Sequence, residues 1–152
     1  MSLTIVPDLP GFLAAGAERR VVSVHTRLLA DDFTPVGLYH QLCGDRPNTF
    51  LLESAEGGVW SRYSFVGVNA VATLTEAGGT AHWGFSGRPI AGLPDGGDPL
   101  RVLAETLTLL HTPREDDLPP LVSGMVGYLG YDVVRRLERL PDGNPDDLGI
   151  PE

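Results

Sequence analysis

Four short strand-like segments lie close together between residues 49 and 85, and their spacing restricts the folds open to the chain. They cover residues 49–54, 59–66, 69–75 and 79–85, and each combines apolar or β-branched residues with flanking turn residues. The turns Glu56-Gly57-Gly58 and Glu76-Ala77-Gly78 connect the first pair and the last pair. Connections this short join neighbouring antiparallel strands, whereas parallel strands need a long crossover. The sequence therefore predicts an antiparallel meander.

Three helices are predicted from the residues that would cap them. Thr34 caps the free amides of a helix over 34–43, and Pro35 in the first turn sacrifices no hydrogen bond. Gly44 tolerates the left-handed conformation that ends such a helix. Asp8 caps a short helix through residue 17, in which we expect Phe12 and Leu13 to face inward. A third helix starts at Asp98-Pro99, and its apolar residues form a single stripe, namely Leu100, Leu103, Ala104, Leu107 and Leu110.

The remaining segments add two predicted strands and one helix. Residues 21–28 alternate as a strand does, and residues 121–129 form a strand whose two glycines indicate close approach of another backbone. Residues 131–140 form an amphipathic helix, with Tyr128, Tyr131 and Asp132 in structural, core-packing positions. The nearby charged residues should form a solvated face; they are Arg135, Arg136, Glu138 and Arg139. Together these elements predict an α+β fold, a mainly antiparallel sheet with packed helices.

Length and charge exclude several classes of protein. The 152 residues fit one domain or one lobe of a larger protein. The net charge of −9 argues against a nucleic-acid surface, since phosphate binding needs a basic face. No apolar stretch of roughly 18 residues predicts a transmembrane helix, and the first residues lack the features of a secretory signal. Residues 1–3 are also consistent with an expression-vector remnant.

Side-chain chemistry indicates no complete active site. Cys43 is the single cysteine of the sequence, which excludes an internal disulfide and suits a reducing cytoplasm. The four histidines are scattered, without metal-ligand spacing. The acidic residues toward the end of the sequence fall in loops, and neither a nucleophile elbow nor a dinucleotide fingerprint is present. We therefore predict no catalytic and no metal-binding residue in this chain.

Glu53 and Ser54 are the candidate ligand-binding residues, with Arg62 as a third. The pair ends the first predicted strand, and Arg62 lies on the returning strand. Carboxylate and hydroxyl oxygens suit an ammonium group, and a guanidinium suits a carboxylate, so the three could hold a small zwitterion. The spacing by itself favours a simpler interpretation, a polar pair that stabilises a hairpin.

A family resemblance favours the ligand-binding interpretation over the hairpin-stabilising one. LLES (51–54), followed by GGVWSRYSFVG (57–67), resembles the amino-terminal signature of anthranilate synthase component I. Three further stretches agree in order: RLLADDFTPVGLYHQL before it, then GMVGYLGYDVVRRLERLP and PDDLGIPE after it. The resemblance covers roughly residues 21–152, with residues 1–20 as a preceding segment that includes the short helix.

The resemblance implies a function for the whole protein. Members of the family convert chorismate to anthranilate and pyruvate in tryptophan biosynthesis, using Mg²⁺ and ammonia from a glutamine amidotransferase subunit. Their two-lobed fold places the tryptophan feedback pocket between the non-catalytic lobe and the catalytic domain. Carried over to this sequence, the pocket residues are Glu53 and Ser54. The chorismate- and magnesium-binding motifs do not occur here, so we expect the catalytic domain to be absent and the chain alone to be inactive.

Two alternatives remain open at this point. Component I of 4-amino-4-deoxychorismate synthase, in the folate pathway, resembles the same family closely. A stand-alone amino-acid-binding or subunit-docking module is the alternative from a different class. Because the core of such a lobe normally packs on a second domain, self-association of the isolated lobe is also expected.

Overall fold

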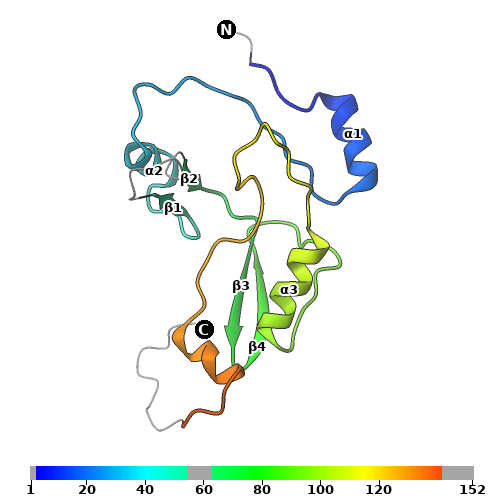
Figure 1. Cartoon of the computed structure of the whole chain (residues 1–152), viewed down its shortest axis with the longest axis vertical. Coiled ribbons are helices and arrows are strands. Elements are labelled where there is room, and N and C mark those ends of the chain that lie inside the picture. The colour runs from blue at the N-terminus through cyan, green and yellow to red at the C-terminus, as the bar shows by residue number, and fades with distance from the viewer. Residues whose placement is uncertain (1–2, 55–62, 142–152) are drawn as a thin grey trace. The chain divides into compact units, whose positions relative to one another are not determined.

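The computed structural model describes residues 3–54 and 63–141, and these residues divide between two compact units. Unit 1 comprises Met1–Ala70 and Leu107–Gly124, and unit 2 comprises Val71–Thr106 and Met125–Glu152. Figure 1 shows the elements of both units along the chain. None of the helices within the described ranges has the length and apolar character needed to cross a membrane. Helices and antiparallel strand pairs occur together, which confirms the predicted α+β class.

The two helices of unit 1 begin at the predicted caps. α1 spans Leu9–Glu18, and the Asp8 carboxylate accepts a hydrogen bond from the Gly11 amide at 2.9 Å. α2 spans Pro35–Cys43, and the Thr34 hydroxyl accepts one from the Gly37 amide at 3.1 Å. Each cap satisfies one of the amides that a helix start leaves without an intrahelical partner. α2 ends at Gly44, whose φ of 53° is a conformation that glycine adopts readily.

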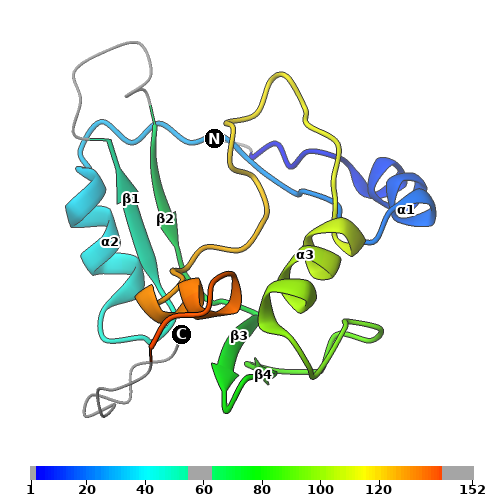
Figure 2. The same ribbon diagram turned by 60° about the horizontal axis from the view of Figure 1, so that its bottom comes forward.

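α2 lies beside the hairpin of unit 1 (Figure 2). β1 (Phe50–Glu53) pairs antiparallel with β2 (Ser64–Gly67), with Phe50 opposite Gly67 and Glu53 opposite Ser64. The buried Cys43 thiol at the end of α2 lies 3.7 Å from the Gly67 carbonyl oxygen. The Tyr39 hydroxyl lies 3.0 Å from that of Thr49, just before β1. These contacts fix the hairpin against α2.

Unit 2 is built on a second, longer hairpin. β3 (Ala72–Ala77) pairs antiparallel with β4 (Thr80–Phe85) across the turn residues Gly78 and Gly79, both at positive φ. Two-residue hairpin turns favour such values because their twist matches that of the strands. The Trp83 indole donates a 2.8 Å hydrogen bond to the Pro94 carbonyl, and its ring stacks on Phe85. α3 (Pro99–Leu109) follows, and the short 3-10 helix η1 covers Tyr131–Arg136.

Three strand predictions are wrong for the described residues. The strands form two two-stranded sheets instead of one meander, and Asn69, between β2 and β3, has a left-handed φ of 58° that interrupts an extended run. Residues 21–28 contain one isolated bridge, between His25 and Val6, because no continuous partner strand lies alongside them. Residues 121–129 form no strand, and Gly124 has a φ of 143° that a regular strand does not use.

Helix predictions fail where they depend on tertiary packing. The helix expected over 131–140 is a six-residue 3-10 helix, whose Val133 and Leu137 amides bond three residues back. On α3 the fully buried residues are Val102 and Thr106, whereas Leu107 of the predicted stripe is half exposed. The buried face is therefore rotated from the one that hydrophobicity alone indicates.

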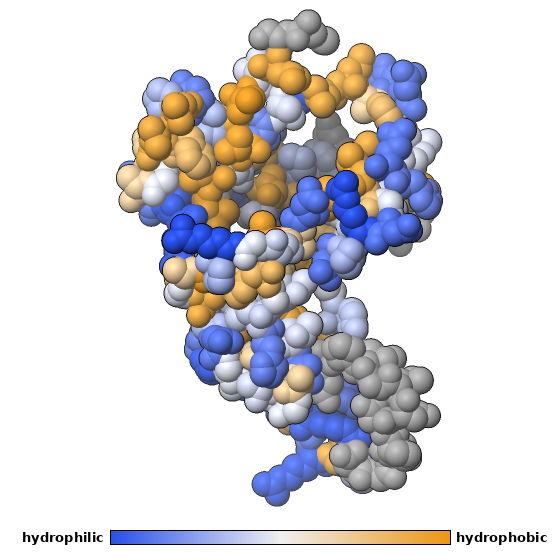
Figure 3. Space-filling view, turned by 180° about the vertical axis from the view of Figure 1, so that it is seen from behind, coloured by the Kyte–Doolittle hydropathy of each residue, from blue (hydrophilic) through white to orange (hydrophobic). Residues whose placement is uncertain are grey.

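Large apolar side chains remain exposed over much of unit 1. Leu9 and Leu13 of α1 are 69% and 62% exposed, and Phe12 is exposed as well, so the inward-facing prediction for α1 is wrong. Figure 3 shows apolar residues on the surface over this helix. Four apolar residues are buried among the described residues, namely Cys43, Ala81, Val102 and Leu118. This small core is the main departure from an ordinary domain of comparable length.

Candidate functional site

The predicted ligand-binding pair lies at the end of β1, where the chain leaves the strand toward β2. Glu53 is the last residue of β1 and pairs with Ser64, the first residue of β2, while Ser54 follows directly. Both Glu53 and Ser54 are exposed. Arg62 lies outside the described residues, as does its expected approach to Glu53. The described part of the site is thus a carboxylate and two hydroxyls at the end of a two-stranded sheet where β1 finishes and β2 begins.

Strand register decides which side chains share a face with Glu53. Alternate residues of a strand point to the same face, so Glu53 shares its face with Leu51 and, across the ladder, with Ser64 and Val66. Ser64 is a functional candidate that sequence reasoning missed, because its position opposite Glu53 depends on the register. Its signal was the RYSF run itself, in which the serine occupies the alternate position after Arg62.

The charge of Glu53 is not neutralised by the described residues. No side-chain hydrogen bond or ion pair joins Glu53 to another residue within 3–54 or 63–141. A carboxylate that has no such partner, and that lies next to hydroxyl oxygens able to accept hydrogen bonds, can bind an ammonium group. The aromatic rings of Tyr63 and Phe65, whose centroids are 6.1 Å apart, lie at the start of β2 and add apolar surface near this end.

An open hollow of roughly 950 Å³ occurs elsewhere in unit 1. It is formed by α1 and residues 19–22, with Phe12, Leu13 and Val21 among its apolar walls and Arg19 at its rim. Arg19 faces Glu115 at 3.9 Å, a partly exposed ion pair of small energetic value. Glu53 and Ser54 do not line this hollow.

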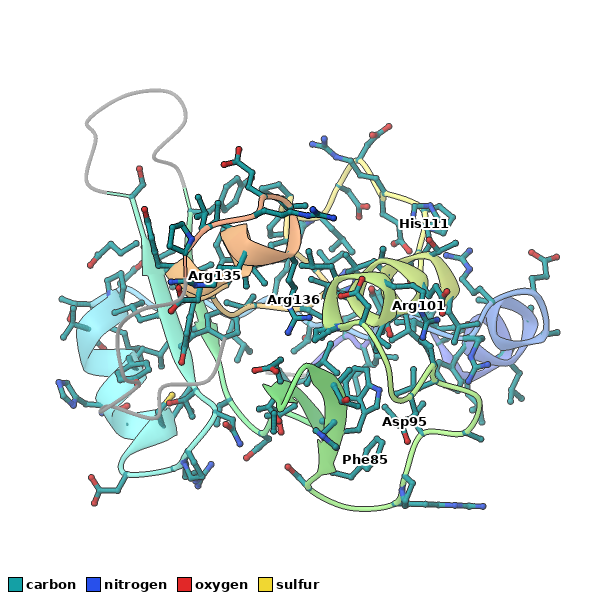
Figure 4. All side chains as sticks on the ribbon, turned by 90° about the horizontal axis from the view of Figure 1, so that it is seen from below. Phe85, Asp95, Arg101, His111, Arg135 and Arg136 are labelled. Atoms are coloured by element: carbon teal, nitrogen blue, oxygen red, sulfur yellow. The ribbon has the colours of Figure 1, made fainter. Side chains whose placement is uncertain are left out.

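The GYLGYD region differs from what its sequence predicts. Tyr128 and Tyr131 are both exposed, with Tyr131 at 89%, so the core-packing prediction for them is wrong. Arg136 is half buried and forms ion pairs with Glu76 and Asp98, so its assignment to a solvated face is also wrong. Figure 4 shows Arg136 on η1 among the side chains of unit 2. η1 covers Tyr131–Arg136, so Tyr128 lies outside it, and from its last residue Arg136 reaches Glu76 and Asp98.

A metal site would need several His, Cys, Asp or Glu side chains close together. Within the ranges that the structure describes, no three His, Cys, Asp or Glu residues lie close enough to hold a metal ion. The Mg²⁺ that the family resemblance implies for the catalytic domain stays a prediction for the whole protein.

The relatives found by comparison with known proteins share one name. The chain is 48% identical over 149 residues to anthranilate synthase component 1 of Arthrobacter globiformis, covering 97% of this chain and 28% of that protein. It is 51% identical over 142 residues to the protein of the same name from Mycolicibacterium smegmatis, covering 93% and 27%. The chain is related to a segment of anthranilate synthase component 1. No protein-family model matches it.

These comparisons confirm the family resemblance and extend it. The anthranilate synthase component 1 of Thermus thermophilus is still 42% identical over 135 residues. A match that covers 97% of the chain must reach into residues 1–20, which the sequence motifs had not included. The chain spans a little over a quarter of the length of these curated relatives.

Proposed function

We propose that the chain is the amino-terminal, non-catalytic lobe of an anthranilate synthase component 1, a cytoplasmic lyase of tryptophan biosynthesis. The whole protein would convert chorismate to anthranilate and pyruvate. The observation that supports this best is the 48–51% identity to proteins of that name across 93–97% of the chain. Catalysis, Mg²⁺ binding and the use of ammonia from a glutamine amidotransferase subunit are proposed for the whole protein, and none is assigned to a residue of this chain.

The specific role proposed for this lobe is feedback inhibition by L-tryptophan. Glu53 and the hydroxyls of Ser54 and Ser64 would bind the ammonium group, and Arg62 would bind the carboxylate. Two observations support the assignment: the pair is exposed at the end of β1, beside the first residue of β2, and Glu53 has no ion-pair partner among the described residues. Binding at a seam with the catalytic lobe would favour one arrangement of the two lobes, with a coupling of about 1–3 kcal/mol between inhibitor and substrate.

The test is to replace Ser54 in the full-length protein. Ser54→Phe should raise the tryptophan concentration for half-maximal inhibition at least about tenfold, or about 1.4 kcal/mol, while kcat stays within about twofold. Ser123→Phe introduces the same ring at another exposed serine of unit 1 and should change neither quantity. Equal loss of activity and inhibition in Ser54→Phe would contradict the regulatory assignment.

The same preparation decides which enzyme this is. The product should be ortho-aminobenzoate with release of pyruvate, and formation of 4-amino-4-deoxychorismate without release of pyruvate would favour 4-amino-4-deoxychorismate synthase instead. The isolated 152-residue chain should show no turnover of chorismate. Tryptophan binding by a full-length protein without chorismate turnover would favour the binding-module alternative.

A further inference from the structure

We propose that η1 is a strap held on unit 2 by charge more than by apolar burial, and that Arg136 fastens it. The strap is defined as residues 131–138, which comprise η1 and the two residues that follow it. The inference concerns unit 2 and does not depend on the tryptophan assignment at the hairpin of unit 1.

Arg136 joins three segments that are distant in sequence. Its Nη2 lies 3.3 Å from the Glu76 carboxylate at the end of β3, and its Nη1 lies 3.8 Å from the Asp98 carboxylate just before α3. The same Glu76 carboxylate accepts a hydrogen bond from the Gly79 amide in the hairpin turn. One guanidinium thus connects the strap, the hairpin turn and the start of α3 (Figure 4).

The Arg136–Glu76 pair is more buried than the Arg101–Glu105 pair of α3. The two side chains are 23% and 11% exposed, whereas those of Arg101 and Glu105 on α3 are 50% and 49% exposed. Water and salt screen a partly buried pair less than an exposed one. Removing one member leaves the other charge poorly solvated, which costs more than losing a surface pair.

Apolar packing contributes little to holding the strap. No residue of η1 is buried, and Tyr131 and the following Leu137 are largely exposed. Val133 and Val134 are half buried. The Arg135–Asp132 pair, at 2.7 Å, lies within the strap and does not attach it to another element. A six-residue 3-10 helix has little stability of its own. Arg136 is therefore the side chain through which the described ion pairs join the strap to β3 and to the start of α3.

The consequence is a segment that can open while the rest of unit 2 stays folded. Local openings of this kind occur where apolar contacts are few and backbone hydrogen bonds are exposed. The strap has three amides that report opening, because those of Val133, Leu137 and Glu138 donate hydrogen bonds within residues 130–138. Raising the salt concentration should increase opening by screening the carboxylates from Arg136.

Amide hydrogen exchange of the 152-residue chain tests the proposal. Glu76→Gln keeps an acceptor for the Gly79 amide but removes the charge, and Arg136→Gln removes the cation. Each should accelerate exchange of the three strap amides roughly three- to tenfold, an effect between those of exposed and buried pairs. The amides of the β3–β4 ladder should keep their wild-type rates. Arg101→Gln, which makes the same charge change on α3, should leave the strap unchanged.

Two results would overturn the proposal. One is unchanged strap exchange in both variants. The other is parallel acceleration of the strap and the β3–β4 ladder in Glu76→Gln, which would make the pair part of the whole unit's stability instead of a local fastening. In the wild type, raising ionic strength from about 0.01 M to about 1 M should accelerate strap exchange, and in Arg136→Gln this salt effect should be lost. A salt effect that persists in the variant also counts against Arg136.

Discussion

Single side chains with well-defined neighbours explain much of the local structure. The caps at Asp8 and Thr34 were predicted correctly because a helix start is set by residues within one turn of it. The contact between Phe50 and Gly67 was not predicted, since it depends on which residues the two strands place opposite each other. The burial of Thr106 was missed for a similar reason, because it depends on which face of α3 is covered.

Gly67 should not tolerate a side chain. A methyl group there would overlap the ring of Phe50 across the β1–β2 ladder, and such overpacking costs about 1–3 kcal/mol. Gly67→Ala should lower the free energy of unfolding by that amount, measured by urea denaturation of the chain. Gly16→Ala is the matched control, since nothing lies within 4 Å of its added methyl and α1 favours alanine. Equal effects of the two substitutions would show that the Phe50 contact is not the cause.

Removal of the Thr106 hydroxyl should stabilise the chain. Its side chain is fully buried on α3, and its oxygen makes no hydrogen bond within the part of the chain that the structure describes. Replacing a buried hydroxyl that lacks a partner by a methyl group of the same shape removes a desolvation penalty of about 1 kcal/mol or more. Thr106→Val should therefore raise the unfolding free energy, whereas Thr106→Ser should lower it. Destabilisation by both would mean that the hydroxyl has a partner in solution.

Elements were predictable where their ends carry local signals. α1, α2 and α3 follow from Asp8, Thr34 and Asp98 with the prolines after them, and both hairpins follow from glycine-containing turns. The segments 21–28 and 121–129 have strand-like sequences but no continuous partner strand among the described residues, and the sequence of one segment does not reveal its pairing partner. For the same reason the position of Glu53 at the strand end was predictable, while its register partner Ser64 was not.

The two capped helices should respond differently to loss of the cap. α2 packs against the β1–β2 hairpin and contains the buried Cys43, whereas α1 has no buried residue. Thr34→Ala should lower the unfolding free energy of unit 1 by about 1 kcal/mol, because α2 is coupled to the hairpin. Asp8→Ala should mainly fray α1, with loss of helical circular dichroism and little change in the unfolding midpoint. Thr34→Ser retains the capping oxygen and should behave nearly as wild type.

At the scale of the whole molecule, the sequence indicated the family and the α+β class but not the two units. The family was readable because four motifs occur in order, and the relatives at 48–51% identity agree with it. The division into units depends on contacts between segments far apart in sequence, such as Thr112 with Val21 and Arg136 with Glu76. Neither periodicity nor turn chemistry carries that information.

The exposed apolar surface of α1 leads to a prediction about association. Leu9 and Leu13 are largely exposed on this helix, which buries no residue of its own. Since burying one leucine side chain contributes about 1.5–3 kcal/mol, the isolated chain should self-associate through this surface as its concentration rises. Sedimentation velocity should show a concentration-dependent increase in mean mass. The Leu9→Gln, Leu13→Gln double variant should weaken association at least roughly tenfold.

Ala14→Gln places the same polar group at an exposed position of α1 without removing a large apolar side chain, so this variant should associate as the wild type does. Association that is unaffected by the double variant would place the contact on another surface. A chain that stays monomeric at all concentrations would show that exposure of these leucines does not drive self-association. If α1 is instead covered by the rest of the full-length protein, the same two substitutions there should lower its thermal stability, because they would remove buried contacts and not merely exposed ones.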